Sequence, residues 1–122
     1  MSTEFGPLTA SLARRILEIA PYAERLRVGR LVPPLGLTSS HVRSLRELHL
    51  HLEPDPRSLP GIDVAAAAAW IERVLGDGEL AGRIRTLAAE AAPYVDTCRK
   101  LRDLVGTRLS QAGDALGPEA ER

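Results

Sequence analysis

Apolar residues recur at helical spacing in the first third of the chain. A helix is expected to begin after Thr9, whose hydroxyl can accept a hydrogen bond from the first turn, and to bury a stripe of leucine and isoleucine. Pro21 breaks or kinks this helix, and because proline is tolerated in a first turn, a second helix is expected over residues 21–31. Residues 32–36, which include two adjacent prolines, then interrupt the pattern.

The stretch over residues 41–53 fits two patterns. One is a helical stripe of four apolar residues, Val42, Leu45, Leu48 and Leu52. The other is a strand, in which leucine alternates with polar residues over residues 47–53. We expect a helix, because hydroxyl residues at 38–40 offer caps before it and no second strand-like run is present for pairing.

The second half of the chain predicts three more helices with clear boundaries. Asp63 can cap a helix that runs through five alanines to Trp70, and Gly76 can end it. Asp77 can cap the next helix, and Pro93 can open the last one. Each of these helices carries an apolar stripe, so each is expected to bury one side.

Together these elements predict an all-α fold, a compact bundle of five or six short helices. Residues 1–8 are expected to form a flexible N-terminal arm, residues 9–112 a single helical domain and residues 113–122 a frayed tail. A chain of 122 residues fits one domain and buries about two-thirds of its unfolded surface, so it can fold without a disulfide or a metal.

The charge balance disfavours several classes of partner. Lysine plus arginine number 16 and aspartate plus glutamate number 16, so the formal net charge is zero and nucleic acid is an unfavourable partner. No apolar run is long enough to span a bilayer, and no signal-peptide pattern opens the chain. We therefore expect a cytoplasmic protein of bacterial type that makes no membrane contact. Basic residues dominate residues 11–46 and acidic residues dominate residues 47–96. This asymmetry suits packing of the two halves against each other or self-association as a dimer, but we favour the third interpretation, solvated faces of separate helices.

Candidate chemistry is sparse. Three histidines, His41, His49 and His51, are the candidates for a metal site, but no cysteine pair or known ligand spacing accompanies them. Cys98 lies in the apolar stripe of the last helix and is expected in the core, not as a nucleophile. We therefore expect no catalytic residue, no bound metal and no cofactor, and we expect that the protein is not an enzyme.

Five short segments resemble an uncharacterised family of helical domains found in bacteria and archaea. They are residues 45–48, 56–58, 70–77, 79–81 and 101–102. This chain has Leu59, Pro60 and Gly61 where the family pattern has two aromatic residues and a histidine. The resemblance implies a small, mostly helical domain of unknown function.

The leading hypothesis is a non-enzymatic helical module for protein–protein interaction, an accessory subunit or adaptor of a bacterial complex. The expected contact residues are Trp70, beside its alanine face, and four arginines of the first helices, Arg14, Arg15, Arg25 and Arg27. An alanine face beside a tryptophan is also typical of an intramolecular core, so that reading stays open.

Two alternatives of other classes remain. One is a small DNA-binding regulator of winged-helix or helix-turn-helix type, which would use the helix expected after residue 38. The other is a protein that binds a metal through its histidines.

Overall fold

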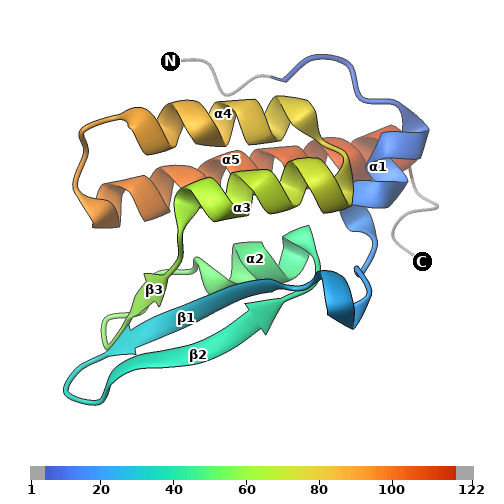
Figure 1. The fold of residues 1–122 in the computed structure, drawn as a ribbon. Helices are drawn as coiled ribbons and strands as arrows, with labels where there is room; N and C mark the ends of the chain where they lie inside the picture. The colour runs from blue at the N-terminus through green and yellow to red at the C-terminus, as the bar shows by residue number, and fades with distance from the viewer. Residues whose placement is uncertain (1–4, 118–122) are drawn as a thin grey trace.

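The computed structural model describes residues 5–117, in which helices lie on one side of a small antiparallel sheet (Figure 1). The helices are α1 (Ala10–Leu17), α2 (Leu45–His51), α3 (Val64–Trp70), α4 (Gly78–Ala89) and α5 (Tyr94–Leu116). The strands are β1 (Leu26–Val32), β2 (Gly36–Val42) and β3 (Leu59–Gly61). The fold is therefore mixed α/β, and the prediction of an all-α bundle is wrong.

Side-chain caps start three helices where the sequence predicts them. Thr9, Asp63 and Asp77 each accept a hydrogen bond from the backbone N–H three residues further on. A π-helical segment, η2 (Ile71–Leu75), continues α3 and ends at Gly76, whose φ of +73° is the left-handed conformation of a glycine C-cap. These local signals are strong enough to fix the boundaries of α1, α3 and α4.

The error in fold class lies in residues 21–42, where a hairpin replaces the expected helices. A short 3₁₀ turn, η1 (Tyr22–Glu24), leads into β1, and Pro33, Pro34 and Leu35 connect β1 to β2. The two strands pair antiparallel along their whole length. The polar sequence of β2 shows no apolar alternation, so the strand depends on the turn and on pairing with β1.

The helix expected over residues 41–53 is present but shorter. The Ser44 hydroxyl accepts a hydrogen bond from the Glu47 N–H, and the Glu47 carboxylate accepts one from the Arg43 N–H. This reciprocal arrangement, of the capping-box kind, starts α2 at Leu45. The hydroxyl residues at 38–40, expected as caps, lie in β2 instead.

The core lies between the helices and the inner face of the sheet. Leu26 and Val42, which pair at the end of the hairpin, are both buried. Arg30 also belongs to the inner face, and its guanidinium donates to the Ser58 hydroxyl and to the His51 carbonyl. These bonds tie β1 to the end of α2 and to the loop before β3.

The long helix α5 packs against α1, α2 and α4, and α3 packs against α4. The fully buried side chains include Ile16, Leu45, Leu48, Ile71, Leu80, Ile84, Leu101 and Val105. No helix within residues 5–117 is both long and apolar enough to cross a membrane.

The N-terminal segment of the described chain is held by contacts. The Phe5 ring lies 4.7 Å from the Arg108 guanidinium carbon, the Gly6 N–H donates to Glu79, and the Gln111 amide donates to the Gly6 carbonyl. At the other end, α5 continues past residue 113, where the tail was expected to begin. The rest of the predicted arm and tail, residues 1–4 and 118–122, lies outside the described residues.

Candidate functional site

Trp70 packs in the core, as the intramolecular reading of the alanine face requires. Its side chain is 2% exposed, and its indole N–H donates to the Glu24 carbonyl at 2.6 Å. A partner would have to open the fold to reach this ring. The Trp70 ring itself is therefore not an exposed contact, although Ala65, Ala66 and Ala69 of α3 are exposed.

The four arginines expected as contact residues divide into two pairs. Arg14 and Arg15 lie on α1, where the Arg15 guanidinium donates to the Val74 carbonyl at 3.0 Å. Arg25 and Arg27 lie at the start of the hairpin, Arg27 within β1. Only the second pair is next to the sheet.

The three histidines lie apart. The His41 ring, in β2, meets the Tyr22 ring edge-on with centroids 5.3 Å apart. His49 of α2 packs closely against Gly106 of α5. A Cβ added to Gly106 would lie only 3.0 Å from the His49 Nε2. No three His, Cys, Asp or Glu side chains within residues 5–117 are grouped so as to hold a metal ion.

His51 makes the stability of the fold depend on pH. Burial, together with the nearby Arg30 guanidinium, lowers the pKa of His51 below its ordinary value of 6.5. The unfolded chain therefore binds more protons than the folded chain just below that pH, and stability through this group is lost as the pH falls. We expect urea unfolding to show a larger loss between pH 7 and pH 5 in the wild type than in His51→Gln. His49→Gln is the control, and equal losses in wild type and His51→Gln would contradict the prediction.

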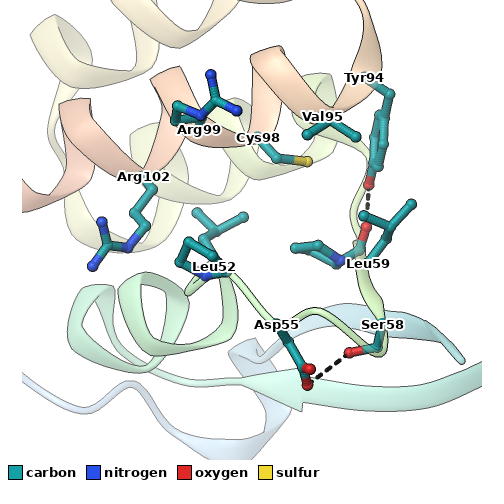
Figure 2. A pocket seen from close by; sticks show the side chains of 11 residues that line it. Leu52, Asp55, Ser58, Leu59, Tyr94, Val95, Cys98, Arg99 and Arg102 are labelled. Atoms are coloured by element: carbon teal, nitrogen blue, oxygen red, sulfur yellow. Dashed lines mark hydrogen bonds between the residues drawn. The ribbon is translucent and has the colours of Figure 1, made fainter.

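A cavity of about 180 Å³ lies between α5 and the loop over residues 52–60 (Figure 2). The Tyr94 hydroxyl closes one end of it by donating to the Pro60 carbonyl and accepting from the Ile62 N–H. Burial raises the pKa of the Cys98 thiol, which is 5% exposed. The thiol is therefore protonated at neutral pH, as expected of a core cysteine.

The charged groups at the rim do not activate this thiol. Figure 2 shows the guanidinium groups of Arg99 and Arg102 turned away from the sulfur. The Asp55 carboxylate accepts hydrogen bonds from the Ser58 hydroxyl and the Arg57 N–H, which lower its pKa and hold the loop. The Ser58–Asp55 pair in the lining holds the loop, and the lowered pKa of the Asp55 carboxyl makes it a weak base. No histidine is among the residues that line the cavity beside the thiol.

The outer face of the sheet points away from the helices and carries exposed leucines (Figure 1). Leu31 of β1 lies opposite Leu37 of β2 on one side and opposite Leu59 of β3 on the other. These three residues, hereafter the leucine patch, are 42%, 72% and 37% exposed. The Leu37 side chain lies across two glycines of the neighbouring strands. If a Cβ were added to Gly29, it would lie 3.2 Å from the Leu37 Cδ1, and a Cβ added to Gly61 would lie 2.8 Å from it. Three strands thus contribute to one apolar surface.

The opposite end of the hairpin is cationic. A hollow of about 270 Å³ is lined there by six residues: Arg25, Arg27, Val28, Ser39, Ser40 and His41. The Arg25 guanidinium lies 4.1 Å over the Tyr22 ring and donates to the Tyr22 carbonyl. Within residues 5–117, neither Arg25 nor Arg27 forms an ion pair with a carboxylate. Arg25 and Arg27, which lie beside His41 in this hollow, are hereafter the cationic end.

The sheet order β2-β1-β3 leaves β2 at an edge. Arg30 lies opposite Pro60 in the β1–β3 pair, and because proline has no N–H, this cannot be a hydrogen-bonded pair. The Arg30 backbone groups must therefore point to Thr38 of β2, and the Thr38 hydroxyl does donate to the Arg30 carbonyl. By alternation, the N–H and C=O groups of Leu37, Ser39 and His41 point to the free edge.

This edge lacks the features that usually protect exposed strands. The seven residues of β2, Gly36–Val42, include no proline and no lysine, arginine, aspartate or glutamate. Their register with β1 is continuous, without a bulge. The edge is therefore open to pairing with another strand.

Comparison with models of protein families, with curated proteins and with solved structures finds no match for this chain. The resemblance of the five short segments to a helical family accordingly stays a prediction. Function has to be inferred from the surface of the chain itself.

Proposed function

We propose that this chain is a non-enzymatic protein–protein interaction module, an accessory subunit or adaptor, that binds its partner through the outer face and free edge of its sheet. The observation that carries the proposal is the unprotected edge of β2 next to the leucine patch. Unpaired backbone groups offer hydrogen bonds to an added strand, and exposed leucines offer apolar area that a partner can cover.

The rest of the molecule suits a scaffold for this surface. The inner face of the hairpin is fixed by Leu26, Val42 and the hydrogen bonds of Arg30, so the outer face is presented on a rigid element. In the cavity beside Cys98 the thiol is protonated and the Asp55 carboxyl is a weak base, which favours binding over catalysis. Arg25 and Arg27, predicted as contacts from the sequence, lie beside this surface and are kept in the proposal, whereas Trp70 is not.

The test is native mass spectrometry of the protein purified gently from its own host. We expect the wild type to carry a stoichiometric partner and Leu37→Asp to have lost it. Removing water from a carboxylate on the leucine patch costs free energy that the interface does not recover. Leu50→Asp is the matched control, because Leu50 is 61% exposed and lies on α2, not on the sheet. Both variants are expected to unfold within about 0.5 kcal/mol of the wild type in urea.

A partner that stays bound to Leu37→Asp, or a wild type that carries no partner and does not self-associate, would contradict the proposal. Loss of the partner from both variants would place the contact elsewhere and would also contradict it. A homodimer that Leu37→Asp dissociates would identify the partner as a second copy of the chain.

A further inference from the structure

We infer that the partner contributes an extended strand that adds antiparallel to β2 and places an acidic side chain at the cationic end. This inference rests on the proposed function and specifies the chemistry of the partner. It commits to a segment of another protein, because the surface is charged at one end and apolar at the other, and each end selects a different residue.

The geometry of β2 sets the spacing of the recognised side chains. Two properties are shared by Leu37, Ser39 and His41. Their backbone groups point to the free edge, and their side chains lie on the outer face, as do those of the β1 residues paired with them. The residues of an added strand that lie beside these three are likewise every second residue of that strand. The first and the last of them are about 13 Å apart. In an antiparallel strand, the residue beside His41 comes first and the residue beside Leu37 comes four positions later.

The cationic end selects the first of these residues. Arg25 is held in place by the Tyr22 ring and carbonyl, so its guanidinium loses little freedom on binding. Neither Arg25 nor Arg27 has a carboxylate partner within the described chain, and Ser39, on the same outer face as His41, also lines this hollow. Aspartate or glutamate fits this donor set, because guanidinium and hydroxyl groups bind carboxylate oxygens by charge-assisted hydrogen bonds.

The leucine patch selects the last residue. Leu37 is the member of the leucine patch that lies on β2, and it is 72% exposed, so an apolar side chain beside it on the added strand covers part of its area. The middle position, beside Ser39, faces a small polar residue. The recognised segment therefore reads as an acidic residue, a small residue two positions on, and an apolar residue two positions after that.

A second copy of the chain fits this pattern poorly. If two β2 strands paired antiparallel about Ser39, His41 of one copy would lie beside Leu37 of the other. No carboxylate would then reach the cationic end from the paired strand, since β2 contains no acidic residue. Charge complementarity thus favours a different chain as the partner.

The experiment uses the full chain, labelled with ¹⁵N, and two synthetic peptides with blocked ends. The acidic probe is Thr-Glu-Thr-Ser-Thr-Val-Thr, and the matched probe has glutamine in place of glutamate. We expect both probes to shift the amide signals of Leu37, Ser39 and His41 most strongly. The acidic probe is expected to bind about fivefold more tightly at low salt, and added salt should remove this difference.

Two variants locate the charge that is recognised. Arg27→Glu is expected to reverse the preference, so that a probe with lysine in place of glutamate binds best. Arg14→Glu is the matched control, because Arg14 is an exposed arginine on α1 and not on the sheet. It is expected to leave the preference for glutamate unchanged.

The outcomes separate the inference from the proposed function. Equal binding of the glutamate and glutamine probes, or a preference that Arg14→Glu alters as much as Arg27→Glu, would overturn the acidic partner and leave strand addition intact. Absence of shifts at the three edge amides with either probe at millimolar concentration would overturn strand addition itself. Shifts at these amides that appear on raising the protein concentration alone would show a second copy at the edge and overturn the inference.

Discussion

Replacing Arg108 with methionine is expected to lower the free energy of unfolding by about 3–5 kcal/mol, because it leaves a buried carboxylate without its cation. Arg108 is 1% exposed, and its Nε and Nη2 donate to the Asp77 carboxylate at 2.7 Å and 2.9 Å. Asp77 is fully buried and also caps α4 by accepting from the Leu80 N–H. The carboxylate is therefore fixed at the helix start and cannot turn towards water when the guanidinium is removed.

Urea unfolding followed by circular dichroism measures this effect. Arg85→Met is the matched control, since it breaks the exposed Glu72–Arg85 pair at 2.9 Å and is expected to change stability little. The double variant Asp77→Ser/Arg108→Met keeps a hydroxyl cap and removes both charges, so it should recover part of the loss. An Arg108→Met variant as stable as Arg85→Met would show that the buried pair contributes nothing.

The same pair connects the N-terminal segment to the core. Arg108 also donates to Gln111, whose amide donates to the Gly6 carbonyl, and the Phe5 ring lies against the Arg108 guanidinium. The sequence predicts a flexible arm over residues 1–8, yet Phe5 and Gly6 contact Arg108, Gln111 and Glu79. These partners lie far along the chain, so no local pattern reveals the contacts.

Helix boundaries could be predicted because the signals that set them are local. Thr9, Asp63 and Asp77 accept hydrogen bonds from N–H groups only three residues away, and Gly76 needs only its own left-handed conformation. Each of these interactions is complete within one turn of helix. They appear in the structure as the sequence predicts.

The sheet could not be predicted because its signals are distributed over three segments. The polar residues of β2 form a strand only through pairing with β1. The strand β3 is only three residues long, and one of the three is a proline. Leu31 and Leu37 flank the two prolines, which read as a break between helices. In the hairpin that the prolines allow, the same two leucines lie directly opposite each other.

Arg25 and Arg27 show how a change of element alters a predicted surface. On the helix expected over residues 21–31, residues two positions apart point about 200° apart around the axis. In extended chain they project on the same side, which is why both line one hollow with His41. Their role as contact residues stays a prediction, and the change from helix to strand is what brings the two arginines together.

Replacing Trp70 with alanine is expected to cost about 3–5 kcal/mol of unfolding free energy, the range for removing a large buried aromatic side chain. The ring is 2% exposed and its N–H reaches across the fold to the Glu24 carbonyl, just before the hairpin begins. Trp70→Phe keeps most of the apolar volume and loses this hydrogen bond, so about 1–2 kcal/mol is expected.

Urea unfolding of both variants, followed by circular dichroism, tests these values, and acrylamide quenching of the wild-type fluorescence tests the burial directly. Because Trp70 is the only tryptophan in the chain, weak quenching in the native state can be assigned to this ring. A contact residue would behave differently: Trp70→Ala would keep the stability of the fold and lose the partner, and the native ring would be quenched readily. We expect Trp70→Phe to retain the partner that Leu37→Asp loses, since Trp70 supports the start of the hairpin from within and the leucine patch lies on its outer face.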